Sequence, residues 1–338
     1  MSKVVLGMSG GVDSSVAAII LQKEGYEVIG VTFQTIDDFD CNDAIEVCKK
    51  LNIEHHVMDI RKDFKEKVMD SFINDYVSGI TPNPCVICNK FIKFKFLEDA
   101  KELYNADYIA TGHYSSVKDG KLYMSVDLNK DQSYFICLVD KSILNHTLFP
   151  LEGVTKDEVR SIANEYGLIN ANKKDSYDVC FITDKFKDYL SKFVSKSSGD
   201  IVDISTNKVL GKHNGLMYYT VGQRRGLDVG GSDDRIFVVS KDFEKNILYV
   251  AKGSNNSFLN SNSCIITNVN FITDNKPVNC LCKFRYRSEL SLCNLEYLSD
   301  GNVLVKYDNV KSVTSGQICA FYNENECLGG GIIKEVNK

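Results

Sequence analysis

The chain is predicted to be an α/β protein in which an N-terminal domain with a parallel sheet precedes two small β domains, the last a β-barrel. In the first half, short apolar segments alternate with segments of helical periodicity, the pattern of a parallel sheet covered by helices on both faces. After the polar run 195–199, the pattern changes to short strands separated by turns. A length of 338 residues fits two or three domains. We therefore expect domains at 1–195, 196–253 and 254–338.

The elements of the first half follow from apolar spacing and from residues that start or stop helices. Apolar residues 4–6 predict a first strand, and a helix at 16–24 follows with Gly25 as its stop. Thr155 is a good N-cap for a helix that runs to about Tyr166, with Gly167 as its stop. The other predicted elements are strands at 28–33, 54–59 and 108–111 and helices at 42–51, 62–77, 91–103 and 185–194.

The second half contains short apolar runs bounded by turn residues, which favours an all-β structure. The predicted strands are 199–204, 218–221, 236–240, 247–251, 264–271, 279–284, 303–307, 317–321 and 327–334. We read them as a small sheet domain followed by a barrel.

The turn after the first strand carries the strongest chemical signal in the chain. Residues 6–15 read Leu-Gly-Met-Ser-Gly-Gly-Val-Asp-Ser-Ser. A strand, a glycine turn and a helix N-terminus in this order form an anion cradle, because backbone N–H groups and the helix dipole converge there. Gly10 and Gly11 allow a phosphate to approach the backbone, and Ser9 and Ser14 add hydroxyl donors. No lysine follows the glycines, and the loop resembles instead the SGGxDS loop of the PP-loop ATP pyrophosphatases, which cleave ATP to AMP and pyrophosphate.

Charge and composition restrict the protein class. A formal net charge of −5 argues weakly against nucleic acid, although basic clusters such as Lys90, Lys93 and Lys95 can still form a local patch. We expect a cytoplasmic protein without a membrane partner, because no signal peptide is visible and no apolar run reaches the roughly 20 residues of a membrane helix. Most of the twelve cysteines are expected to be buried thiols rather than disulfides. The best candidates are Cys48, Cys137, Cys264, Cys293, Cys319 and Cys327.

Cys85 and Cys88 lie in a second segment rich in candidate functional residues, Thr-Pro-Asn-Pro-Cys-Val-Ile-Cys-Asn-Lys at 81–90. Cys88 is placed just before the helix predicted from residue 91, where the helix dipole and Lys90 should lower the pKa of its thiol. The residues alone leave three roles open: a nucleophile, half of a zinc site, or a ligand of an iron–sulfur cluster. A zinc site needs a second pair, and Cys280 and Cys282 are spaced like one face of a strand instead. Composition alone favours a buried thiol for Cys180.

Six segments together resemble the bacterial-type tRNA-specific 2-thiouridylase family. They are the glycine loop, the Pro-Asn-Pro-x-x-x-Cys-Asn-Lys segment, Thr-Gly-His-Tyr at 111–114, Lys-Asp-Gln-Ser-Tyr at 130–134, Asp-Ser-x-x-x-Cys-Phe-Ile at 175–182 and Tyr-Thr-Val-Gly-Gln-Arg-Arg-Gly-Leu at 219–227. Ser-Gly-Gln at 315–317 also matches, and the resemblance covers residues 4 to 321. It implies ATP-dependent 2-thiolation of the wobble uridine of tRNA. The C2 oxygen is a poor leaving group, but once it is joined to AMP it leaves readily when a sulfur nucleophile attacks C2.

The resemblance also implies roles for individual residues. Cys180 is expected to carry the persulfide sulfur, and Cys88 to release it by forming a disulfide with Cys180. ATP with Mg²⁺ is expected at Gly7, Met8, Ser9, Gly10, Gly11, Val12, Asp13, Ser14, Phe33 and Gly112. The anticodon region of tRNA is expected at Asn83, Pro84, Cys85, His113, Lys130, Asp131, Gln132, Arg285, Tyr286 and Gln317. A sulfur-donating protein, either a cysteine desulfurase or a relay carrier, is the further partner.

Cys85 departs from the family pattern, because many members have an aspartate at this position. Its presence creates an alternative in which Cys85, Cys88 and Cys180 hold a [4Fe–4S] cluster that carries the sulfur. Apart from this cluster, no metal site is predicted. Two other functions compete: a PP-loop enzyme that acts on a small molecule, for which no glutaminase signature is visible, and a non-catalytic, zinc-stapled RNA-binding module. AMP release stimulated by tRNA would separate all three.

Overall fold

The computed structural model describes residues 1–174, 179–182, 185–194, 197–227, 229 and 234–337. The first part of the chain forms a five-stranded parallel sheet in the order β3-β2-β1-β4-β7. Its strands are β1 (Lys3–Gly7), β2 (Glu27–Gln34), β3 (Glu54–Asp59), β4 (Tyr108–Ala110) and β7 (Thr147–Leu148). The predicted α/β class is confirmed.

Two apolar cores cover the two faces of this sheet, because successive side chains of a strand point to opposite faces. Val4 and Leu6 of β1 pack against α1 (Val12–Lys23), α2 (Asn42–Leu51) and α9 (Lys156–Glu165). Val5, between them, belongs to the core of the other face, which includes α6 (Phe94–Leu103). The first strand therefore fixes both layers.

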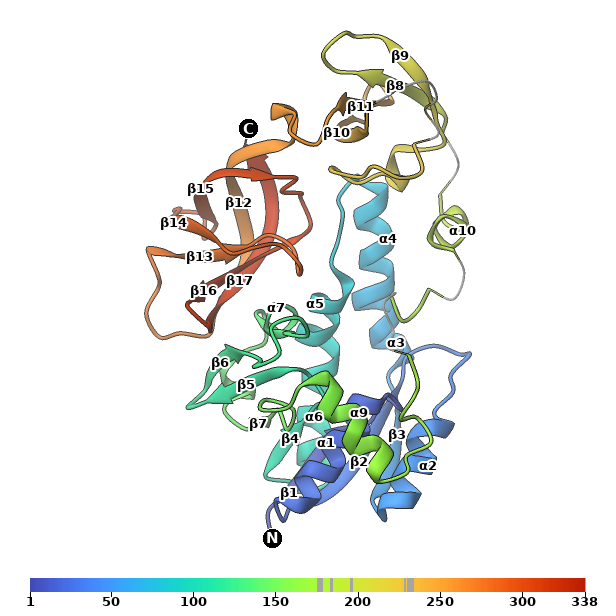
Figure 1. The fold of residues 1–338 in the computed structure, drawn as a ribbon, viewed down its shortest axis with the longest axis vertical. Coiled ribbons are helices and arrows are strands. Elements are labelled where there is room, and N and C mark those ends of the chain that lie inside the picture. Colours follow the sequence, from blue (N-terminus) through green and yellow to red (C-terminus); the bar gives the residue numbers. More distant parts are fainter. Residues whose placement is uncertain (175–178, 183–184, 195–196, 228, 230–233, 338) are drawn as a thin grey trace.

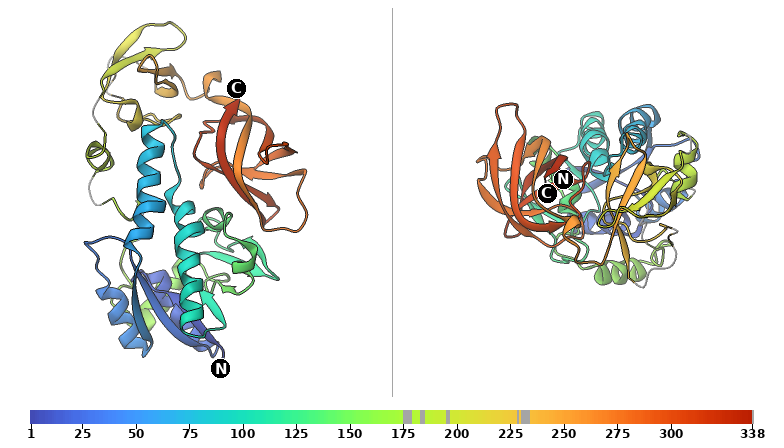
Figure 2. Two further views of the ribbon diagram at one scale, coloured as in Figure 1. Left: turned by 180° about the vertical axis from the view of Figure 1, so that it is seen from behind. Right: turned by 90° about the horizontal axis from the view of Figure 1, so that it is seen from above.

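Two long helices rise from the sheet, and each is interrupted by one π-helical turn. The first comprises α3 (Arg61–Phe64), η1 (Lys65–Met69) and α4 (Asp70–Val77), and it reaches the small β sheet at the far end of the molecule (Figure 1). The second comprises α5 (Pro84–Cys88), η2 (Asn89–Lys93) and α6, and it runs beside the first (Figure 2). The segment between these helices, residues 78–83, lies where the three parts of the chain meet.

The second half of the described chain is built from strands, as predicted. A four-stranded sheet has the order β10-β11-β8-β9, with strands β8 (Gly199–Asp203), β9 (Val209–His213), β10 (Ile236–Asp242) and β11 (Ile247–Lys252). Six further strands close into a barrel through the β12–β17 pairing. They are β12 (Asn260–Phe271), β13 (Asn279–Lys283), β14 (Ser291–Tyr297), β15 (Val303–Lys311), β16 (Ile318–Asn323) and β17 (Glu326–Asn337).

A hairpin from the first half extends the sheet of the barrel. Strands β5 (Ser115–Lys118) and β6 (Lys121–Met124) form it, and Leu122 pairs with Cys327 of β17. This pairing joins the N-terminal half to the barrel through backbone hydrogen bonds, and the sequence pattern did not predict it. The short elements α7 (Ser133–Ile136), α8 (Lys141–Leu144), α10 (Phe186–Ser191), η3 (Leu216–Tyr218) and η4 (Ser257–Leu259) complete the described chain.

Several predicted boundaries were wrong. The helix predicted at 16–24 begins at Val12, directly after the glycine loop, and the helix predicted at 91–103 begins at Pro84. The strand predicted at 218–221 is absent, because the 3₁₀ turn η3 and a loop occupy this part of the described chain. Strands β5, β6, β7, β9 and β14 were missed. Among the described residues, no helix is long and apolar enough to cross a membrane.

Candidate active site

The glycine loop for which the sequence predicts an anion cradle lies at the carboxyl end of β1, between β1 and α1. Helix α1 begins at Val12, and its N-cap residue, Gly11, has no side chain with which to cap the first N–H groups of the helix. Gly10 has a φ of +74°, and a Cβ there would lie 3.1 Å from Cβ of Asp43. The Ser14 hydroxyl accepts from the Ser9 N–H at 3.3 Å and donates to the Gly11 carbonyl at 3.1 Å, which fixes the shape of the loop.

Gly112 closes one side of the cradle. A Cβ at this position would lie 2.7 Å from the backbone nitrogen of Ser14. Only glycine therefore lets the chain after β4 come this close to the N-terminus of α1. Phe33 lies at the end of the neighbouring strand β2, where it packs against Phe96 with ring centroids 6.2 Å apart.

Hydrogen bonds from Tyr114, Lys156 and Asn170, which the sequence did not predict, hold the glycine loop and the first turn of α1 in place. The Asp13 carboxylate accepts from the Tyr114 hydroxyl at 2.8 Å and from Nζ of the buried Lys156 at 2.7 Å. The buried Asn170 donates to the Gly10 carbonyl and to the Ser15 hydroxyl, each at 2.9 Å. Lys156 is the first residue of α9, and nothing in its local sequence distinguishes it from a surface lysine.

The segment with two cysteines is itself helical, which corrects the expected environment of Cys88. The Asn83 side chain caps α5 by accepting from the Val86 N–H at 3.3 Å, and Pro84 occupies the first helical position. Cys88 thus lies inside a helix rather than before one. Burial raises the pKa of its thiol to about 12, and the nearby charge of Lys93 opposes this shift without cancelling it. The predicted lowering of this pKa was wrong.

Cys180 is exposed, contrary to what composition favoured, and it interacts electrostatically with Cys85 and Cys88. A negative charge on Cys180 would raise the pKa values of Cys85 and Cys88, so the three thiols share one environment. The next residue, Phe181, is buried against Phe64 and Phe72, with ring centroids 5.7 and 5.3 Å away. This anchor holds Cys180 beside the helices. Asp175 and Ser176 of the same motif lie outside the described residues.

Lys93 is the cation that faces this thiol group. Its charge lowers the pKa values of Cys85, Cys88 and Cys180, although desolvation by the surrounding protein has the larger, opposite effect on each, even on Cys85 and Cys180, which keep exposed surface. Its Nζ lies 3.5 Å from Nε2 of His113. The sequence placed Lys93 in a basic cluster but assigned it no role.

Several residues expected to contact tRNA make hydrogen bonds within the protein. The Gln317 side chain donates to the carbonyls of Thr81 and Pro82 at 2.9 and 3.2 Å, which ties the barrel to the segment before Cys85. Arg285 of the barrel donates to the Val221 carbonyl at 3.0 Å and so reaches the loop after η3.

The remaining expected tRNA residues surround helix α7. Asp131 is buried and accepts from the N–H groups of Ser125 and Ser133. Gln132, next to the half-buried Lys130, accepts from the Tyr114 N–H at 2.9 Å. The ring of Tyr286 lies 4.5 Å from that of Phe135, between centroids. These contacts hold the loop beside the thiol segment, because Asn89 donates to the Phe135 carbonyl at 2.9 Å.

The cysteines of the barrel strands are buried. Cys280 and Cys293 are cross-strand partners with Sγ atoms 3.5 Å apart, and both are buried. All six cysteines expected to be core residues are buried. Within the described ranges, no three His, Cys, Asp or Glu side chains are arranged to hold a metal ion.

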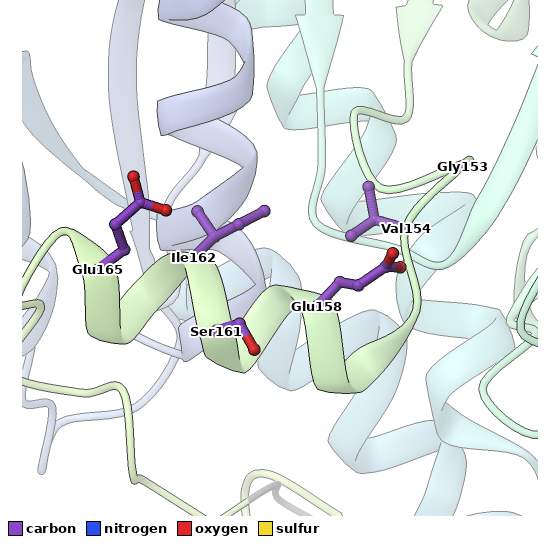
Figure 3. Close-up of a pocket in the computed structure, with 6 residues that line it drawn as sticks. All are labelled: Gly153, Val154, Glu158, Ser161, Ile162 and Glu165. Carbon is purple, nitrogen blue, oxygen red and sulfur yellow. The ribbon is translucent and has the colours of Figure 1, made fainter.

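A shallow depression on the outer surface lies along α9 and is distinct from the thiol group (Figure 3). Its lining residues are Gly153, Val154, Glu158, Ser161, Ile162 and Glu165. The Glu158 carboxylate is already used, because it accepts from the Thr155 N–H at 2.8 Å in the predicted capping arrangement. The depression therefore shows no convergent chemistry.

Comparisons with known proteins cover almost the whole chain. Family models match residues 2–184 (tRNA methyl transferase HUP domain), 187–252 (tRNA methyl transferase PRC-barrel domain) and 261–333 (Aminomethyltransferase beta-barrel domain). The chain is 45% identical to the tRNA-specific 2-thiouridylase MnmA of Mesoplasma florum, over 98% of each chain. It is 42% identical to the protein of that name from Mycoplasmopsis synoviae, over 98% of this chain and 95% of the relative. For Bacillus cytotoxicus the identity is 44%, over 99% and 95%. The models are described by methyl transfer, whereas these relatives are named for thiolation.

Proposed function

The chain belongs to the tRNA-specific 2-thiouridylase family, and from this premise we propose how its residues carry out 2-thiolation of a tRNA uridine. It is a tRNA sulfurtransferase that uses ATP. The observation that carries the residue assignment is the placement of Cys85, Cys88 and Cys180 in one environment, on a scaffold that also holds a glycine-loop anion cradle.

The first step is adenylation of the uridine C2 oxygen. The loop residues Gly7–Ser14, with Phe33 and Gly112, bind ATP together with Mg²⁺, and the N-terminus of α1 faces the phosphates. The uridine oxygen attacks the α-phosphorus, and pyrophosphate leaves. The close approach of Gly112 to Ser14 supports this assignment, because it leaves no side chain between the cradle and the end of β4.

The second step is sulfur transfer at the thiol group. The terminal sulfur of a Cys180 persulfide attacks C2, and AMP leaves with the former uridine oxygen. The Cys88 thiolate then attacks Sγ of Cys180, so that a Cys88–Cys180 disulfide forms and the sulfur stays on the uridine. A thiol reductant restores both cysteines, and a persulfide-carrying protein reloads Cys180. The exposure of Cys180 supports access by such a donor.

The target base is placed beside the start of α5. Asn83, Pro84 and Cys85 lie there, and Cys85 is exposed. Anticodon bases can be turned out of their stack and bound singly. We propose that Lys130, Gln132 and Tyr286 contact tRNA from the neighbouring loop and barrel. Hydrogen bonds within the protein hold this surface in shape: Gln317, Arg285, His113 and Asp131 each make one, and so does Gln132.

A [4Fe–4S] cluster on Cys85, Cys88 and Cys180 is the alternative sulfur carrier. Three thiolates are suitable donors for such a cluster. In the part of the chain that the structure describes, however, the three side chains do not converge on a common metal position. We therefore route no step through a cluster. Anaerobically purified protein should thiolate tRNA fully without iron or acid-labile sulfide, and activity that depends on the cluster would overturn the persulfide route.

The decisive experiment supplies the full chain with ATP, Mg²⁺, unmodified tRNA and a persulfide donor. It measures 2-thiouridine in the digested tRNA by mass spectrometry. Cys180→Ala should abolish the product while leaving ATP binding intact, and Cys41→Ala, which removes a half-buried thiol from the loop before α2, should have no effect. AMP release should depend on tRNA, and a Cys88–Cys180 disulfide should accumulate without reductant. Thiolation by Cys180→Ala would refute the assigned role.

A further inference from the structure

Lys156 is a buried cation at a position where a helix does not favour one. It is the first residue of α9, and its side chain is only 9% exposed. Lysine is seldom buried without a partner, and a positive charge at the N-terminus of a helix opposes the helix dipole. The start of α9 already has other partners, because the Lys156 N–H donates to the Asp127 carboxylate at 3.3 Å and Glu158 completes the capping arrangement. Lys156 instead places its ammonium against another helix.

That helix is α1, which packs against α9. Nζ of Lys156 donates to Oδ1 of Asp13 at 2.7 Å, and the Tyr114 hydroxyl donates to the same oxygen at 2.8 Å. Asp13 is the second residue of α1, so it lies in the first turn of the helix, beside the N–H groups that follow the glycine loop. Two donors thus converge on one carboxylate oxygen at the N-terminus of α1.

The Asp13 carboxylate and a bound phosphate share the same positive end of α1. The helix dipole attracts anions there, but a carboxylate in the first turn repels any other anion that approaches. The Lys156 ammonium supplies the positive charge that offsets this repulsion. Tyr114 cannot do so, because a neutral hydroxyl orients the carboxylate without offsetting its charge.

We propose that Lys156 is a positioning residue for ATP: its ammonium holds and neutralises the Asp13 carboxylate, which leaves the N-terminus of α1 available to the phosphates. This role rests on the proposed function, because it presupposes that the glycine loop binds ATP. The residues after α9 act on the same loop, since Asn170 donates to the Gly10 carbonyl and to the Ser15 hydroxyl. The segment 156–170 thus holds a charge of α1 at one end and the backbone of the glycine loop at the other.

The test compares ligands that share adenosine but differ in charge, and it needs no tRNA. The full-length protein is titrated by calorimetry with ATP, ADP, AMP and adenosine in EDTA, so that the negative charge of the ligand falls in this order to none. Lys156→Met should weaken ATP binding about tenfold, ADP and AMP binding progressively less, and adenosine binding not at all. Lys156→Arg should restore most of the wild-type affinity for ATP, because it keeps the charge.

Matched controls separate charge from folding. Lys23→Met removes an exposed cation from the last turn of α1, about 15 Å along the helix from Asp13, and should change none of the four affinities. The thermal unfolding midpoint reports whether each variant is folded. If Lys156→Met does not fold, Lys156→Gln provides the same comparison with a polar, neutral side chain.

The outcomes distinguish this role from a merely structural one and from the proposed function. Equal weakening of all four ligands in a folded neutral variant of Lys156 would overturn the proposal, and so would an unchanged ATP affinity. Wild-type protein that does not bind ATP would refute the ATP site, and this role with it. If the charge dependence is found but the wild type leaves tRNA unmodified, the proposed function is refuted instead.

Discussion

Replacing Gly112 by alanine tests whether the glycine loop needs a residue without a side chain at this position after β4. The new Cβ would lie 2.7 Å from N and 3.0 Å from Cα of Ser14, and 2.8 Å from the carbonyl carbon of Asp13. All three are backbone atoms, so no side-chain rotation can relieve the clash. Gly112 does not have a positive φ, so the cost is steric. Overpacking of this kind costs about 1–3 kcal/mol.

Gly7→Ala is the matched control at the end of the adjacent strand β1. Its Cβ would make only ordinary contacts, at 3.7 Å from the Leu97 methyl groups and 3.8 Å from the Ala110 carbonyl. We expect Gly112→Ala to lower the thermal unfolding midpoint by several degrees and ATP affinity by at least tenfold, because the N–H of Ser14 must move. Gly7→Ala should change the unfolding midpoint little. Circular dichroism and calorimetric ATP titration measure the two quantities. If Gly112→Ala matched the wild type in both stability and ATP affinity, the claim that the site requires the close approach of residue 112 to Ser14 would be refuted.

Three further changes test the contacts between the parts of the chain. Gln317→Leu removes the side-chain N–H donors to the carbonyls of Thr81 and Pro82 and should lower the free energy of unfolding by about 1–3 kcal/mol. It should reduce thiolation but not ATP affinity. The control Gln22→Leu, which loses an exposed hydrogen bond to the Leu51 carbonyl, should change neither thiolation nor ATP affinity. Phe181→Ala should speed alkylation of Cys180 and slow thiolation, because the ring anchors this segment, and the exposed Phe193→Ala serves as its control; an unchanged Cys180 rate would contradict the anchor. Burial lowers the pKa of Lys241 to about 8, and its Nζ donates to the Gly79 and Tyr219 carbonyls. The unfolded chain therefore binds more protons than the folded protein between about pH 8 and the ordinary lysine pKa of about 10.4. Over this range, urea unfolding should show that the stability of the wild type rises with pH relative to that of Lys241→Met. Parallel pH profiles of the two proteins would contradict the lowered pKa.

Local sequence signals predicted the elements whose signals are themselves local. The first strand, the glycine loop and the Thr155 capping arrangement depend on residues within one turn of each other, and all are present. The start of the cysteine helix was misplaced because Pro84 was interpreted as part of a rigid approach, whereas it occupies the first helical position after the Asn83 cap. The π turn has no such signature, since it depends on packing along the whole helix.

The sequence by itself determined the α/β class, the glycine loop that resembles a PP-loop, and which cysteines are candidates for the site. Spacing and residue type carry this information within short segments. Only the tertiary structure placed Lys93 among the thiols, Lys156 behind Asp13, and Gln317 against Thr81. Each of these pairings depends on atoms that chain folding brings together, which local sequence cannot predict. Burial explains why Cys88, expected to have a lowered pKa, has a raised one.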